Sequence, residues 1–295
     1  MSDFVLSCCT AIDTGADWAA ERKMQWLPFH VKIGTEDYAD DFWTKMKPEQ
    51  MYERMAQGEE SHTSQISVGD YTEHFKRILS QGKDILHVTL SSGISGTVNS
   101  ANLAADDLRA QYPDRKLIIV DSLAASSGYG LLMQKLYEQK EKGKTIEEVA
   151  EYARTHRLHV VHWFFSTDLT YYIKGGRVTK TAGFIGTLLN ICPLLNVDYM
   201  GRLIPREKIR SKRKVIERIV EKMKELAENG TEYNDHCYIS HSACLEDAKA
   251  VRDLIEQEFP HMKGNVDIFP IGPTIGCHTG PGTVALFFMG KERID

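Results

Sequence analysis

Residues 85–97 read ILHVTLSSGISGT, in which an apolar run of strand length passes directly into a segment rich in glycine and serine. Residues 97–110 then show the spacing of a helix. The same alternation of strand and helix continues in both directions along the chain. It predicts an α/β protein with a largely parallel sheet, whose ligands bind in the loops at the carboxyl ends of the strands.

The first half of the chain contains apolar runs and helical spacings that alternate regularly. Strands are expected at residues 4–9, 27–33, 85–90 and 117–121, and helices at residues 48–56, 68–79, 97–110, 126–142 and 145–157. Ser67 and Asp70 resemble a capping box at the start of one helix. In the second half, strands are expected at 159–165, 192–197, 237–241, 266–271 and 284–289, and helices at 184–189, 212–228 and 245–258.

The length and composition favour two closely packed domains. A chain of 295 residues is long for one domain, and 42% hydrophobic residues suffice for a sizeable core. We expect a boundary near residue 158, where a second group of elements begins, with no low-complexity linker. A cleft between the two domains is then a natural position for a ligand.

Charge and targeting patterns exclude several functional classes. With 41 acidic and 36 basic side chains the net charge is −5, which argues against nucleic acid as a partner. We find no signal-peptide pattern and no apolar stretch approaching ~20 residues, so we expect a cytoplasmic protein without membrane insertion. The six cysteines form no C-x-x-C pair and are expected to be reduced.

Two hydroxyl-rich segments are candidates for binding an anion. Residues 61–67 precede a capped helix, where serine and threonine most often act only as caps. Residues 91–97 follow an apolar strand, and their glycines allow the backbone to approach a ligand closely. This second segment is neither a G-x-S-x-G elbow nor a Walker A loop, so nucleotide binding lacks its usual anchors.

Histidines and basic residues elsewhere have ordinary and functional interpretations. His278 lies in a glycine-rich segment, 272–282, either as a hydrogen-bonded loop residue or as a partner for a carboxyl or phosphoryl group. The basic cluster 208–214 is either a solvated face with acids nearby or a site for an acidic ligand or partner, and DNA is a weaker reading. His159 and His162 would face opposite sides of a strand, so we expect no metal site there.

Five segments together resemble the DegV family: TSQIS at 63–67, SSGISGT at 91–97, DS at 121–122, KGGR at 174–177 and GCHTGPG at 276–282. The resemblance covers nearly the whole chain. It implies a two-domain α/β protein that binds one long-chain fatty acid. In bacteria the family includes the acyl-carrier subunit of fatty acid kinase, which presents the bound acid to a separate ATP-using protein.

We accordingly expect a three-layer α/β/α domain with a mainly parallel sheet at residues 1–158. A two-layer α/β domain with a mixed sheet is expected at residues 159–295, and its last strand is a candidate for returning to the first domain. The chain departs from the family in having Ser7-Cys8-Cys9-Thr10 where an acidic segment is common, and Ile66 where proline is frequent. Neither departure touches the hydroxyl residues discussed next.

The resemblance also implies site residues. Thr63 and Ser95 match positions that hold the ligand carboxyl, and His278 matches a histidine near the same head group. Ser64 and Gly96 are candidates in the same two segments, and Arg177 and Arg210 are similar to positions assigned to head-group electrostatics or kinase docking. No catalytic residue, metal or cofactor is implied. The expected ligand lies in an apolar tunnel between the domains.

A catalytic reading is the alternative. Ser95 would be the nucleophile and His278 the base of an acyl hydrolase or transferase. No orienting acid is identifiable in the sequence, so we expect a non-catalytic carrier.

Overall fold

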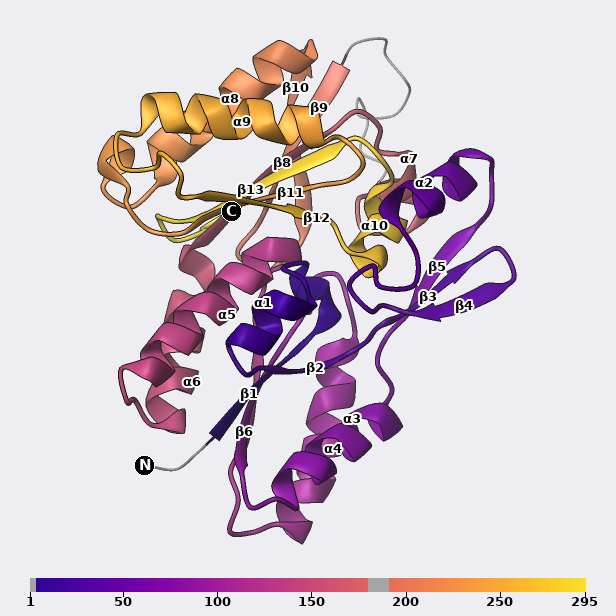
Figure 1. The fold of residues 1–295 in the computed structure, drawn as a ribbon, viewed down its shortest axis with the longest axis vertical. Helices are drawn as coiled ribbons and strands as arrows, with labels where there is room; N and C mark the ends of the chain where they lie inside the picture. The colour runs from indigo at the N-terminus through magenta and orange to yellow at the C-terminus, as the bar shows by residue number, and fades with distance from the viewer. Residues whose placement is uncertain (1–3, 180–190) are drawn as a thin grey trace.

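The computed structural model of the chain describes residues 4–179 and 191–295, which form three β-sheets with helices packed around them (Figure 1). The first, sheet A, is fully parallel, as expected. Its strands, in spatial order, are β2 (Gln25–Leu27), β1 (Phe4–Cys9), β6 (Asp84–Thr89) and β7 (Leu117–Asp121).

Helices cover both faces of sheet A and complete three layers (Figure 1). One pair is α3 (Val68–Leu79) and α4 (Thr97–Gln111), and the other is α5 (Ser126–Glu141) and α6 (Ile146–His156). The predicted capping box is present, because Ser67 Oγ accepts from the Asp70 amide and the Asp70 carboxylate accepts from the Ser67 amide, each at 3.1 Å. The three-layer prediction is therefore confirmed.

Sheet C is the mixed sheet expected in the second half of the chain. In spatial order its strands are β10 (Leu203–Arg210), β9 (Ile191–Val197), β8 (Val160–Ser166), β13 (Thr283–Met289), β11 (Cys237–His241) and β12 (Val266–Pro270). The helices α8 (Lys212–Leu226) and α9 (Leu245–Glu258) cover one face, and α5 packs against the other. The proposed boundary near residue 158 separates the strands of sheet A from those of sheet C.

The last strand, β13, stays in the second domain. It pairs with β8 and β11 in the middle of sheet C, so the suggestion that it returns to the first domain is wrong. All seven of its residues are buried, which suits a strand covered by helices on one face and by the first domain on the other.

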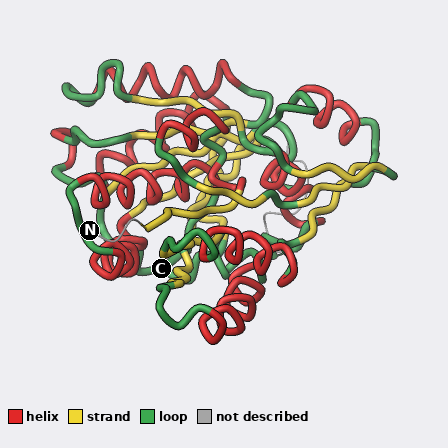
Figure 2. The backbone as a smooth tube through the Cα atoms, turned by 60° about the horizontal axis from the view of Figure 1, so that its bottom comes forward, coloured by secondary structure: helices red, strands yellow, loops and turns green. Residues whose placement is uncertain are grey.

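A third sheet, sheet B, was not expected. Its strands are β4 (Glu36–Ala39), β3 (His30–Ile33) and β5 (Ser61–Ser64), all antiparallel, and α2 (Pro48–Ala56) packs beside it. In the rotated view of Figure 2 this sheet extends to one side of the molecule. The single strand predicted at 27–33 is wrong, because the chain leaves sheet A after Leu27 and enters sheet B at His30. Pro28, which has no N–H to donate, lies at that junction.

Three short helices also lie outside the predicted elements: α1 (Ala16–Glu21), α7 (Thr170–Lys174) and α10 (Pro273–Thr279). The segment 272–282, expected as a loop, thus contains a helix that begins at a proline, a residue favoured at the first helical position. The helix predicted at 184–189 falls outside the described residues. None of the helices that the structure describes has both the length and the apolar character needed to cross a membrane.

Most of the buried apolar side chains that the structure describes form a cluster that runs through both domains, and a smaller cluster lies beside sheet B, with Val31, Ile33, Met51, Tyr52, Met55 and Cys277. Tyr129 on α5 illustrates this continuity, since it is fully buried between the two sheets and its hydroxyl donates to the Val88 carbonyl of sheet A. The cysteines are unpaired and mostly buried, in agreement with the expectation of reduced thiols. The two domains therefore meet along an extensive interface.

Candidate functional site

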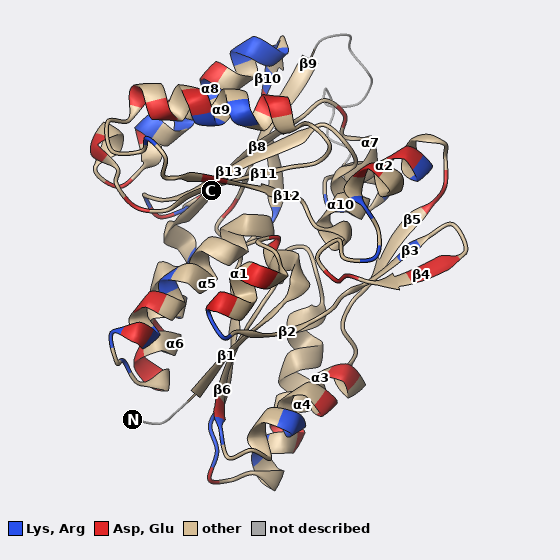
Figure 3. Cartoon of the chain, viewed as in Figure 1, with Lys and Arg blue, Asp and Glu red and all other residues tan. Residues whose placement is uncertain are grey.

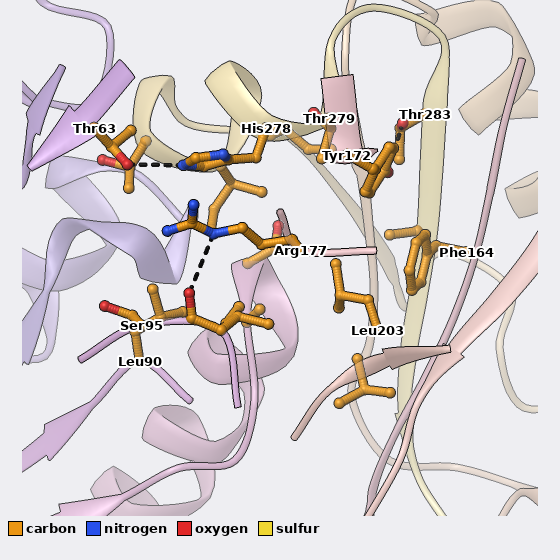
Figure 4. A pocket seen from close by; sticks show the side chains of 18 of the residues that line it. Thr63, Leu90, Ser95, Phe164, Tyr172, Arg177, Leu203, His278, Thr279 and Thr283 are labelled. Carbon is orange, nitrogen blue, oxygen red and sulfur yellow. Dashed lines mark hydrogen bonds between the residues drawn. The ribbon is translucent and has the colours of Figure 1, made fainter. Parts of the chain in front are cut away.

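A cavity of about 310 Å³ lies where three parts of the fold meet (Figure 4). The loops that follow β6 and β7 form one wall, the inner face of sheet C forms another, and β5 with α10 closes the side. This is the position at the carboxyl ends of parallel strands that the sequence predicts. The volume is within the range of about 300–1,000 Å³ that is usual for small-molecule sites.

Thr63 on β5 and His278 on α10 form a hydrogen bond at one end of the cavity. Thr63 Oγ1 and His278 Nε2 are 2.7 Å apart (Figure 4). The other ring nitrogen, Nδ1, is buried, lies against Gly175 and has no partner among the described residues. Gly175 has no side chain at this point, and a Cβ there would collide with the imidazole ring.

The imidazole of His278 is neutral at physiological pH. Burial, reinforced by the positive charge of Arg177, lowers its pKa to about 3. An N–H at Nδ1 would be buried without an acceptor, which is costly, so the proton belongs on Nε2. His278 then donates to Thr63 Oγ1, and the Thr63 hydroxyl proton is left available for a ligand oxygen.

Ser95 lies in the loop between β6 and α4. Its Oγ accepts a hydrogen bond of 3.3 Å from the Thr97 amide, so its own proton is also available for a ligand. The start of α4 adds a partial positive charge that favours an anion. The neighbouring Gly96 allows the Gln65 side chain to lie close, because a Cβ at Gly96 would be 2.6 Å from Gln65 Oε1.

Arg177 follows α7 and projects between the Thr63–His278 pair and Ser95 (Figure 4). Its Nε donates to the Ile94 carbonyl at 3.2 Å, and its Nη1 donates to the Gly175 carbonyl at 2.5 Å. No carboxylate among the described residues forms an ion pair with it, and burial lowers its pKa. The guanidinium thus brings a positive charge to the polar end of the cavity, and neither of these two hydrogen bonds to described residues uses Nη2.

The rest of the cavity is predominantly apolar. Thr283, Ala285 and Phe287 share the inner face of β13 because side chains alternate along a strand. Phe287 is four residues beyond Thr283, or about 13 Å further from α10 at 3.3 Å per residue. Phe164 and Leu203 lie across the cavity from Thr63 in Figure 4. The cavity therefore has one polar end and an apolar body that leads away from it.

The structure brings together five of the seven residues expected in the site. Thr63, Ser95, Gly96, Arg177 and His278 all line the cavity. Ser64 is exposed and does not line it, because the side chain after Thr63 projects from the opposite face of β5. Arg210 is exposed at the end of β10 and does not line it either.

Sequence reasoning missed most of the cavity wall. The residues that it did not nominate include Gln65, Phe164, Tyr172, Leu203 and Phe287. Gln65 stands in one of the motifs discussed above and could have been singled out. Phe164 and Phe287 belong to continuous apolar runs in buried strands, and such a run looks the same for a cavity wall and for solid core.

The basic cluster 208–214 fits its ordinary interpretation. Lys212 is 2.9 Å from Asp247, and Arg213 is 2.9 Å from Glu217. Acidic and basic residues are interspersed along α8 and α9 in Figure 3. These acids offset the unfavourable placement of positive charge at the start of α8.

One cluster among the described residues has metal-ligand chemistry: Glu138, Asp235 and His236. The ammonium of Lys135 lies 2.8 Å from each of the two carboxylates. His236 Nε2 bonds to Glu138 at 2.9 Å. Lys135 therefore offsets part of the charge of the two carboxylates, and the cluster forms an ion-pair network.

The lowered pKa of His278 predicts a pH-dependent stability. Its folded pKa of about 3 lies below the value of about 6.5 in an unfolded chain, so the unfolded state holds more protons between these values. The stability that the neutral, buried His278 contributes is therefore fully present above pH 6.5 and is lost as the pH falls. At pH 5 the free energy of unfolding is lower by about 2 kcal/mol. Urea unfolding of the ligand-free protein and of His278→Gln between pH 5 and 7 measures it.

We expect the His278→Gln variant to lose less stability on acidification than the parent protein. The buried carboxyls of Asp13 and Asp40 titrate with the opposite sign, since burial raises their pKa, but they are common to both proteins. Equal slopes of unfolding free energy against pH in the two proteins would contradict a neutral, buried His278.

Comparison with known proteins identifies the family. The family model described as "uncharacterised protein, DegV family" matches residues 10–291. A DegV domain-containing protein of Clostridium perfringens is 32% identical over 293 residues, covering 99% of each chain.

Solved structures of DegV family proteins have the same fold as this chain. A fatty-acid-binding DegV family protein from Thermus thermophilus has a TM-score of 0.86 and 25% identity, covering 98% of this chain and 100% of its own. The fatty acid kinase B3 protein of Streptococcus pneumoniae, solved with linoleic acid, shares the fold with a TM-score of 0.82 and 22% identity, covering 99% and 100%. The match over nearly the whole length, together with the five motifs and the fold, establishes that the chain belongs to the DegV family.

Proposed function

We propose that this protein binds one long-chain fatty acid in the cavity, with the carboxyl group between Thr63 and Ser95. The observation that carries the proposal is the polarity of the cavity, which has hydroxyl donors and a positive charge at one end and an apolar body beyond them. The fatty acid in the Thermus thermophilus relative supports the same assignment.

The acyl chain provides most of the binding free energy in this proposal. Burial of about a dozen methylenes at ~0.8 kcal/mol each contributes on the order of 10 kcal/mol before the costs of ordering and association are subtracted. Phe164, Tyr172 and Phe287 offer broad apolar surfaces to such a chain. The carboxyl then orients the ligand and contributes the smaller part of the binding free energy.

The head-group donors suit a ligand that must react later. Thr63 and Ser95 each donate one hydrogen bond from a neutral hydroxyl. Arg177 donates Nε and Nη1 to backbone carbonyls, so the side-on edge formed by Nε and Nη2 cannot give the carboxylate two parallel hydrogen bonds. A carboxylate held in this way is stabilised less than in a bidentate arginine pair, so its oxygen remains a better nucleophile.

We propose that the reaction partner is a separate ATP-using kinase that phosphorylates the bound carboxyl. The chain has no Walker A loop or dinucleotide fingerprint of its own. The name of the Streptococcus pneumoniae relative, a fatty acid kinase B protein, supports this partnership. The exposed Arg210 is then a candidate for contact with the kinase, and a cytoplasmic location follows because the partner consumes ATP.

The geometry does not favour the hydrolase alternative. His278 bonds to Thr63, whereas Ser95 Oγ accepts from the Thr97 amide, so no hydrogen bond joins the supposed base to the supposed nucleophile. No carboxylate bonds to either ring nitrogen of His278 among the residues that the structure describes.

Titration of the delipidated protein tests the proposal. Palmitate should bind at one site per chain, and hexadecanol should bind about 10–100-fold more weakly, because it lacks the charge that the donors and Arg177 favour. A serine-directed fluorophosphonate should leave Ser95 unmodified. Absence of saturable palmitate binding, or covalent labelling of Ser95, would refute the carrier assignment.

A further inference from the structure

A second cavity adjoins the first behind sheet C. It has a volume of about 490 Å³ and is lined by β8, β9, β10, α8 and the C-terminal residues 291–295. His162 and Val197 line both cavities, so these two residues of β8 and β9 belong to the wall between them. A wall at this position can limit the depth of the first cavity.

The shared wall lies at the end of the first cavity that is remote from His278. His162 is paired with Phe287 across β8 and β13, four residues beyond the Thr283 position. Val197 is paired with Leu203 across β9 and β10. These residues would meet the methyl end of an acyl chain whose carboxyl lies at Thr63.

Arg293 holds this wall together. Its side chain is only 7% exposed and donates to four backbone carbonyls. Nη1 reaches Asp198 at 2.8 Å and Val197 at 3.5 Å, and Nη2 reaches Leu123 at 2.9 Å and Arg157 at 3.0 Å.

These four carbonyls come from both domains. Leu123 and Arg157 belong to the first, and Leu123 begins the segment whose Ala125 and Ser126 line the fatty-acid cavity. Val197 and Asp198 are at the end of β9 in the second domain. One guanidinium therefore fixes two opposing parts of the cavity wall relative to each other.

The charge of Arg293 is retained despite burial. Loss of hydration lowers its pKa to about 10, which still leaves it protonated at neutral pH, and Asp198 and Asp121 favour the charged form. An apolar residue could fill the same space but would leave the four carbonyls without their donor.

We propose that Arg293 closes the methyl end of the cavity and so sets the longest acyl chain that the protein accepts. This inference rests on the proposed fatty-acid binding. Without the guanidinium, Val197 and the Leu123 segment lose their common anchor, and the acyl chain can extend past His162 into the second cavity.

Affinities for saturated acids from 14 to 24 carbons, measured for the delipidated full chain and for Arg293→Met, test the proposal. The variant should favour a chain two carbons longer by about tenfold relative to the parent protein. Arg202→Met is the matched control, since Arg202 pairs with Asp198 but lines neither cavity, and it should keep the parent preference.

Val197→Ala is a second test variant, which alters the same wall and leaves the buried guanidinium in place. It should shift the chain-length preference toward longer acids, and it can be measured even if Arg293→Met does not fold. An unchanged chain-length preference in Val197→Ala and in any folded Arg293→Met would overturn the inference. Failure of the parent protein to bind any acid of the series would instead refute the proposed function.

Discussion

Replacement of Leu203 by tryptophan is expected to lower fatty-acid affinity by about 200-fold while the protein remains folded. Leu203 lies on the apolar side of the cavity and is partly exposed at the start of β10, where a larger side chain can be accommodated without overpacking the core. An indole in a space of about 310 Å³ displaces several methylenes of the ligand. Loss of four at ~0.8 kcal/mol each corresponds to about 3 kcal/mol, or about 200-fold.

Leu203→Met is the matched control, because it conserves volume and apolar character. It should bind palmitate with nearly the parent affinity. Titration calorimetry gives the affinities, and thermal unfolding of the ligand-free proteins shows whether each variant is folded. Full affinity in a folded Leu203→Trp variant would mean that the acyl chain does not occupy this cavity.

The double substitution Thr63→Val and Ser95→Ala should weaken palmitate binding by about 100-fold. Each change removes one hydroxyl donor from a charged acceptor, and at about 1.5 kcal/mol each, the lower end for such hydrogen bonds, the two losses amount to about 3 kcal/mol. Hexadecanol binding should change much less, because the alcohol brings no charge to the site. The variant should therefore lose most of its preference for the acid over the alcohol.

Thr63→Val also removes the acceptor of the His278 Nε2 proton, so a decrease in stability of about 1 kcal/mol is expected. Ser64→Ala is the control, since Ser64 is exposed on the opposite face of β5 and does not line the cavity. It should bind both ligands as the parent protein does. Undiminished palmitate affinity in the double variant would contradict the head-group assignment.

The sequence predicted best those elements whose limits depend on local interactions. The helix Val68–Leu79 was predicted with its observed limits, because its capping box lies within four residues of the chain. The error at 27–33 has a different origin. Strands β2 and β3 are separated by two residues but belong to different sheets, and sheet membership depends on pairing with β1 and β5. Hydrophobic pattern alone does not carry that information.

The site was predicted less completely than the fold for a related reason. Thr63 and His278 are 215 positions apart, and their hydrogen bond depends on how sheet B and α10 pack together. Only the resemblance to a family brought them together before the structure did. No family motif pointed to Arg293. A single arginine near the C-terminus has no periodic or motif signal, and its role is evident only from the four carbonyls around it.

The central claim is that one fatty acid occupies the cavity, held by its chain and oriented by its carboxyl. Mass spectrometry of the purified protein, under native and then denaturing conditions, tests it most directly. The account predicts a native mass that exceeds the chain by one acid of about 14 to 20 carbons. That excess should disappear on unfolding, and it should be reduced in Leu203→Trp. Two results together would contradict the account: a native mass equal to that of the bare chain, and a titration in which this empty protein takes up no such acid.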